Sequence, residues 1–212
     1  DLPEATRTGG AADLRGGGAN SGRLTLGLVA AGSIARDALG DVRVQAHCSQ
    51  IGTIEAAFDT EPEGEACTVL NCNDPDAAKQ MLELVKSLRK AGDSIGSTVE
   101  SRIFNIPIGV GEPWFEGLEP ALARALMAIP GARGVEFGRG RDAVTMQGSE
   151  HNDAWGPEGT PLGEDADGAL GGMSTGAPLR IRVHFKPPSS IALPQTTLHV
   201  PSGEMRELQI GG

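Results

Sequence analysis

The chain has 212 residues, 39 % of them hydrophobic, so it is long enough and apolar enough to bury a core. Its net charge of −10 and its acidic isoelectric point argue against nucleic acid or an anionic membrane as partner. The sequence contains no run of about eighteen apolar residues and no signal-peptide pattern, and its three cysteines are an odd number. We therefore expect a cytoplasmic protein in a reducing compartment.

Helix and strand patterns alternate in the first half of the sequence. Asp74 and Pro75 are suited to the cap and first turn of a helix that Gly92 ends. The elements expected here, in chain order, are a loop at 1–14, a helix at 24–39 with Asn20 or Ser21 as N-cap, a strand at 42–51, an acidic loop at 61–65, a helix at 75–91 and a strand at 98–108.

The second half is richer in strands. It is expected to contain a helix at 118–129, a long Gly-rich loop at 148–176, and strands at 134–137, 143–147, 179–186, 196–200 and 205–210. A mixture of helix–strand alternation with a strand-rich end indicates an α/β or α+β sandwich. No exact repeat divides the chain, so we expect a single domain.

The segment from Gly92 to Gly96 matches the GxSxG pattern of a hydrolase nucleophile elbow, with Ser94 as the nucleophile. That elbow requires a strand before the serine and a helix after it. Here the predicted helix precedes and the strand follows. We interpret the segment as a helix C-cap and a turn, and a serine hydrolase as a distant alternative.

Two further patterns lack the context that their chemistry needs. Residues 138–143 resemble a loose dinucleotide-binding fingerprint, but no helix follows to hold a pyrophosphate, so a hairpin turn is expected. Cys48, Cys67 and Cys72 have irregular spacing and no CxxC pair, which favours ordinary buried or loop thiols over a metal site.

A run of three glycines between two arginines precedes the first long helix, in the sequence RGGGANSGR at 15–23. Consecutive glycines allow backbone N–H groups to converge on one anion, and a helix N-terminus adds partial positive charge. Arg15 and Arg23 bring guanidinium groups to the same place. The pattern indicates a phosphate or carboxylate site, and its plain alternative is a flexible loop before a helix.

Two other clusters could hold a ligand. Residues 147–153 gather an amide, a hydroxyl, carboxylates and His151 in a loop, a common location for function. The glycines of 171–176 suggest backbone approaching a flat ligand, and Lys186 with Ser189 and Ser190 suggests an oxygen-rich one. Turns flanking a strand would explain the second cluster equally well.

In this order, the pieces resemble the chorismate synthase family over about 13–212. The resemblance rests on RGGGANSGR (15–23), GDSIGSTVE (92–100), IPIGVGEPWF (106–115), LMAIPGARGVEFGRG (126–140), GSEHND (148–153), GALGGMSTG (168–176) and KPPSSI (186–191). It implies an α+β fold, a β-α-β sandwich with helices layered between antiparallel sheets.

The resemblance also implies an activity. The family eliminates phosphate from 5-enolpyruvylshikimate 3-phosphate to give chorismate, with reduced FMN as a cofactor that undergoes no net redox change. It implies a homotetramer, an anionic small-molecule substrate, and a source of flavin reduction that could be an external reductase. The alternative is a catalytically inactive flavin- or anion-binding remnant of the same fold.

Site residues follow from the resemblance by position. Arg15, Ser21 and Arg23 match substrate-binding positions of the family. The positions that match cofactor contacts are Ala19, Asn20, Ser21, Pro130, Gly131, Gly171, Lys186, Pro187, Pro188, Ser189 and Ser190.

The sequence departs from the family pattern at several points. It has no match to the family's N-terminal Gly-Glu-Ser-His-Gly segment, to its second histidine or to its Arg-His-Asp-Pro region. Ser97 and Pro188 stand where the family usually has Gly and Thr. We expect 1–212 to be one domain, incomplete at both ends, or else a shortened homologue in which His151 is the least unfavourable substitute for the missing acid–base histidines.

Overall fold

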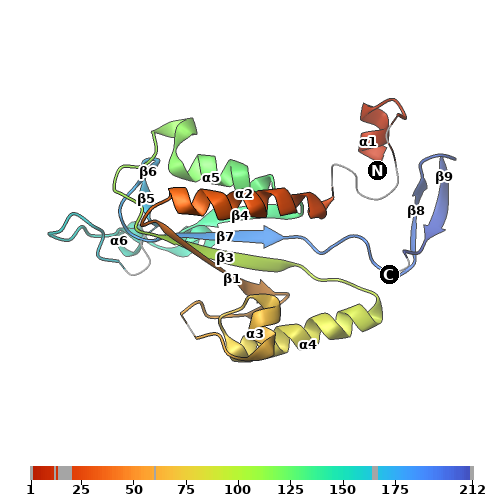
Figure 1. The fold of residues 1–212 in the computed structure, drawn as a ribbon, viewed down its shortest axis with the longest axis horizontal. Helices are drawn as coiled ribbons and strands as arrows, with labels where there is room; N and C mark the ends of the chain where they lie inside the picture. The colour runs from red at the N-terminus through yellow and green to blue at the C-terminus, as the bar shows by residue number, and fades with distance from the viewer. Residues whose placement is uncertain (1, 12, 14–20, 60, 164–166, 211–212) are drawn as a thin grey trace.

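A computed structural model describes residues 2–11, 13, 21–59, 61–163 and 167–210. Its centre is a five-stranded sheet in the order β2-β1-β3-β7-β4, in which every neighbouring pair is antiparallel (Figure 1). These strands are β1 (Arg43–Ile51), β2 (Ile54–Glu55), β3 (Ser97–Phe104), β4 (Ala132–Phe137) and β7 (Leu179–Phe185). The antiparallel α+β class expected from the sequence is confirmed.

Helix α5 (Leu118–Met127) covers one face of the sheet and follows the short 3-10 helix η3 (Trp114–Glu116). Strand β7 alternates buried and half-buried residues, as a strand with one face on a core requires. Leu179, Ile181 and Val183 point into this core, against the apolar side of α5. Their neighbours, Arg180, Arg182 and His184, lie on the opposite face.

A second core lies under the other edge of the sheet, where α3 (Gly64–Leu70) and α4 (Pro75–Ala91) pack against β1 and β2. Met81 and Ala78 are fully buried there. Asp74 accepts hydrogen bonds from the backbone N–H groups of Asp76 and Ala77, and Gly92 ends α4 with a positive φ of 78°. The predicted cap, first turn and stop of this helix are confirmed.

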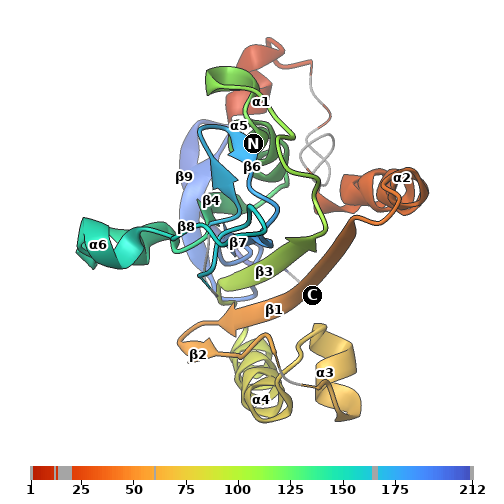
Figure 2. The same cartoon turned by 90° about the vertical axis from the view of Figure 1, so that its left-hand side faces the viewer.

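Several elements stand apart from both cores. Helix α2 (Thr25–Ala38) buries none of its residues, and Figure 2 shows it beside the sheet rather than on it. Strands β8 (Gln195–His199) and β9 (Glu204–Leu208) form an exposed hairpin. None of the described helices is long and apolar enough to cross a membrane.

The loop predictions at 1–14 and 61–65 are wrong in part. Leu2–Arg7 forms the helix α1, in which Arg7 and Glu4, one turn apart, form an ion pair of 2.7 Å. Helix α3 begins inside the acidic run, because Ala66 and Cys67 bury their side chains against α4. Cys48, Cys67 and Cys72 are all free thiols, and the last two are core residues as expected.

The strand predicted at 143–147 and the hairpin turn predicted at 138–143 are also wrong. Gly138 and Gly140 have positive φ angles of 54° and 56°, which turn the chain away from the edge of β4. The following residues form the 3-10 helix η4 (Gly140–Thr145). The predicted loop 148–176 contains α6 (Gly148–His151) and the small hairpin of β5 (Ala169–Leu170) and β6 (Met173–Ser174).

Candidate functional site

Three segments that are distant in sequence meet at the end of the sheet where β7 finishes and β4 begins. Ala132 pairs with Phe185, and the Lys186 backbone N–H donates to the Gly131 carbonyl at 3.0 Å. The chain on the far side of β7 begins β3, where Ser97 pairs with Phe185. Two predicted cofactor-binding stretches, Pro130–Gly131 and Lys186–Ser190, are thus brought together.

The third segment, 92–96, holds the loop after β7 in place. The Ser94 hydroxyl donates to the Pro188 carbonyl at 2.7 Å, and the Gly92 carbonyl accepts from Ala192 and Leu193. A β-carbon on Gly96 would lie 2.8 Å from the Phe185 carbonyl oxygen, so this position requires glycine for close backbone approach. The helix C-cap and turn predicted for the GxSxG match are confirmed.

Lys186 follows β7 at this end of the sheet. Its side chain is exposed, and its Nζ lies 3.5 Å from the carbonyl of its own neighbour, Pro187. Ser189 and Ser190 follow it on the same exposed loop. An ammonium group beside two hydroxyls on a loop anchored through its backbone is able to bind phosphate oxygens.

His184 precedes this loop and was not anticipated as part of the site. Its Nδ1 lies 3.0 Å from the Thr98 hydroxyl, and its Nε2 lies 3.5 Å from a Glu136 carboxylate oxygen. The cross-strand register of β3, β7 and β4 places these three side chains on one face. Predicting the three strands separately cannot reveal that these side chains lie together, because their proximity depends on which strands are neighbours in the sheet.

The predicted anion site before α2 is described only in part. Arg15, Ala19 and Asn20 lie outside the described residues. Ser21 caps the 3-10 helix η2 (Gly22–Leu24), where its hydroxyl accepts from the Arg23 backbone N–H at 3.4 Å. Figure 1 shows this end of α2 towards the same side as the end of β7, but Figure 2 shows α2 displaced sideways from the sheet. The structure does not bring Ser21 or Arg23 into contact with Lys186.

Gly171 and His151 lie at the opposite end of β7. Gly171 is in the β5–β6 hairpin, and the adjacent Gly172 accepts a hydrogen bond from Leu118 at the start of α5. His151 ends α6, and its Nε2 lies 3.3 Å from Asp167. A seven-residue strand spans roughly 23 Å, so these two positions are far from Lys186 in this chain.

Comparison with solved structures defines the class of fold. The chain is similar to a structure titled "Crystal Structure of Chorismate Synthase", with a TM-score of 0.71 and 25 % sequence identity. The similarity covers 80 % of this chain and 57 % of that one. The architecture is therefore the α+β fold of that protein.

Sequence comparison then identifies the family. The chorismate synthase family profile matches residues 1–212. The chorismate synthases of Thermococcus gammatolerans and Aeropyrum pernix are each 43 % identical to the chain, and that of Methanosarcina mazei is 41 % identical. The matches cover 100 %, 90 % and 96 % of this chain, respectively. The chain belongs to the chorismate synthase family, and it spans 61 %, 53 % and 58 % of the lengths of these relatives.

Proposed function

We propose that the protein acts as an FMN-dependent lyase, eliminating phosphate from 5-enolpyruvylshikimate 3-phosphate to give chorismate in the shikimate pathway. The observation that supports it most directly is the meeting of Pro130–Gly131 with Lys186–Ser190 at the end of β7. Both stretches occupy positions that the resemblance assigns to the cofactor, and they are separated by more than fifty residues of sequence.

The residues at this end fit the phosphate tail of the flavin. Lys186 would supply the charge, Ser189 and Ser190 would donate hydroxyl hydrogen bonds, and Pro130 with Gly131 would contact the flavin through the backbone. Pro187 and Pro188 stiffen the loop, and Ser94 fixes the Pro188 carbonyl. Reduced FMN, when bound, would supply transient electron donation to the substrate as phosphate leaves.

The substrate would be held by the arginine-bearing segment before α2. Arg23 is exposed, and as a guanidinium it is suited to bidentate binding of a carboxylate or phosphate. Ser21 is half-buried beside it and would add a hydroxyl to the same anion. We place Arg15, Ala19, Asn20 and Gly171 in the complete binding surface on the family resemblance alone.

None of the described residues is assigned as the general acid or base in this proposal. His151 lies at the far end of β7, where it pairs with Asp167, so we do not assign it proton transfer in chorismate formation. We propose instead that these 212 residues form a binding core and that the general acids come from outside them. A homotetramer and an external flavin reductase complete the proposal as partners.

The proposed function is tested by anaerobic turnover. A longer chain that also carries the family's two histidine segments is mixed with chemically reduced FMN and 5-enolpyruvylshikimate 3-phosphate, beside the 212-residue chain, and chorismate is measured by its absorbance. Turnover that Lys186→Ala reduces at least tenfold, while Lys79→Ala does not, would support the lyase and its site. Lys79 is a suitable control because it is also an exposed lysine, on the first part of α4.

The 212-residue chain alone is expected to bind FMN without turnover, because the general acids are proposed to lie outside it. If the longer chain also binds FMN but forms no chorismate, the result contradicts the lyase assignment and favours the non-catalytic flavin-binding alternative.

A further inference from the structure

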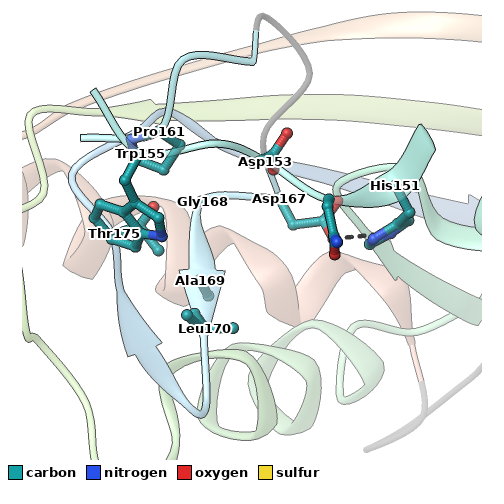
Figure 3. A pocket seen from close by; sticks show the side chains of 10 residues that line it. His151, Asp153, Trp155, Pro161, Asp167, Gly168, Ala169, Leu170 and Thr175 are labelled. Carbon is teal, nitrogen blue, oxygen red and sulfur yellow. Dashed lines mark ion pairs between the residues drawn. The ribbon is translucent and has the colours of Figure 1, made fainter. Parts of the chain in front are cut away.

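A cavity of about 260 Å³ lies at the end of the sheet opposite Lys186, between the loop after α6 and the β5–β6 hairpin. Figure 3 shows its two sides. Trp155 and Thr175 lie on one side, the ion pair of His151 and Asp167 lies on the other, and Ala169 and Leu170 lie between them. The cavity is therefore polar at one end and aromatic at the other, as ligand sites for small molecules commonly are.

Arg139 fixes the polar end. Its backbone N–H donates to an Asp167 carboxylate oxygen at 3.0 Å, and its guanidinium donates to the His151 carbonyl at 3.0 Å. The same guanidinium lies 3.6 Å from Asp153. Arg139 thus orients Asp167 through its backbone, and it orients Asp153 and the loop that carries the histidine through its largely buried side chain.

The charge around the cavity is negative. Asp153 and Asp167 line it, and Glu119 at the start of α5 is close enough to Asp167 for their charges to interact. Burial, and secondarily the charge of Asp167, raises the pKa of Glu119 above its usual range. The Arg139 guanidinium lies beside Asp153, whereas Asp167 accepts only from the Arg139 backbone N–H and lies beside His151. Among the described residues no arginine or lysine side chain forms an ion pair with Asp167, so its charge is not fully balanced.

The aromatic end contains a polar group with no partner. Thr175 is only 6 % exposed and lines the cavity, and its Oγ1 makes no hydrogen bond with any described residue. A buried hydroxyl without a hydrogen-bond partner costs free energy unless a ligand or a water molecule forms a hydrogen bond with it. Trp155 is about half exposed and is held by a β-bridge to Pro161, so its ring is available to a ligand at a fixed place.

We propose that this cavity binds a small organic cation, a protonated amine on a compact apolar skeleton. The ammonium would donate to Asp167 and Asp153 at the polar end, and the apolar skeleton would lie against Trp155 and Leu170 at the aromatic end. An anionic ligand would be repelled by the Asp167 carboxylate. Among the described residues no group of three or more His, Cys, Asp or Glu side chains is arranged to hold a metal ion. This site lies at the other end of β7 from Lys186, beside the hairpin that carries Gly171, and it does not depend on the lyase activity.

The test uses three probes with one ring and different charge: benzylamine, benzyl alcohol and benzoate. Binding to the purified chain is measured by calorimetry and by protein-observed NMR at pH 7. The expected result is roughly millimolar affinity for benzylamine, at least tenfold weaker binding of the other two, and shifts of the Trp155 indole signal. Equal binding of benzoate, or no binding of benzylamine, would overturn the proposal.

Two variants assign the binding to this cavity. Asp167→Asn retains an oxygen that can accept from the Arg139 backbone N–H but removes the negative charge. It should weaken the binding of benzylamine at least tenfold, whereas substitution of the exposed Asp142 by Asn should leave that binding unchanged. Thr175→Val keeps the shape and removes the unpartnered hydroxyl. Because benzylamine has no polar group at its ring end, this change should leave its affinity within about threefold of the wild type, while the free protein melts at the same or a higher temperature. If Asp167→Asn binds benzylamine as the wild type does, the cavity is not the site.

Discussion

Substitution of Gly96 by alanine tests the close packing that forms the end of the sheet. The new β-carbon would lie 2.8 Å from the Phe185 carbonyl oxygen and 3.5 Å from Pro187 Cδ. Both neighbours belong to the strand and loop that carry Lys186, and one of them is backbone, which cannot rotate away. Overpacking of this kind costs about 1–3 kcal/mol of stability. The backbone shift needed to relieve this clash would move Phe185 relative to Ala132 and weaken the hydrogen bond from the Lys186 backbone N–H to the Gly131 carbonyl.

The assay is urea unfolding monitored by circular dichroism, with FMN binding measured in parallel. Gly32→Ala is the matched control, because Gly32 lies inside α2 and a β-carbon there would meet nothing within 4 Å. In a helix that change is neutral or stabilises by up to about 1 kcal/mol. We expect Gly96→Ala to lose stability and FMN affinity together and Gly32→Ala to lose neither. A Gly96→Ala protein as stable as the wild type would refute the packing described at this end.

Three further predictions concern stability, pH and substrate binding. Leu179→Ala should lower the free energy of unfolding by about 2–5 kcal/mol in urea titrations, since Leu179 is fully buried beneath α5. Burial lowers the pKa of His47, so the unfolded chain takes up a proton at this residue more readily than the folded chain does. Stability should therefore fall as the pH drops below about 6.5. His47→Gln should flatten this pH dependence of stability, and the exposed His199→Gln should leave it unchanged. Arg23→Ala should weaken binding of 5-enolpyruvylshikimate 3-phosphate by roughly 2 kcal/mol in calorimetry, with Arg36→Ala on the adjoining helix α2 as control, and unchanged affinity would contradict the placement of the anion site.

Local signals predicted those elements that are stabilised locally. The Asp74 cap, the Pro75 first turn and the Gly92 stop define α4 without reference to the rest of the chain. The alternation from Leu179 to Phe185 defines β7 because one face of that strand is buried. The segment 143–147 also contains β-branched and apolar residues, but two left-handed glycines before it direct it away from the sheet, and nothing in its own residues reveals that.

Motifs indicated the chemistry of the site better than its geometry. Pro130–Gly131 and Lys186–Ser190 were expected to share a ligand, and they are in contact. Gly171 was assigned to the same ligand, yet a strand that separates Gly171–Gly176 from Lys186 must place them at its two ends. Sequence reasoning singled out 147–153 and 171–176 as separate clusters that could hold a ligand, and both contribute to the cavity. It did not predict that they meet, because Arg139 and Asp167 come from other segments that only the folded chain brings together.

The most direct test of the proposed cofactor site compares FMN with riboflavin, which has the same ring and ribityl chain but no phosphate. Flavin fluorescence is titrated with the 212-residue chain and with its Lys186→Ala and Lys79→Ala variants. If Lys186 and its neighbouring serines bind the phosphate tail, FMN should bind at least tenfold more tightly than riboflavin, and Lys186→Ala alone should remove that difference. Equal affinities for the two flavins in the wild-type chain would contradict the assignment of this end of the sheet to the cofactor.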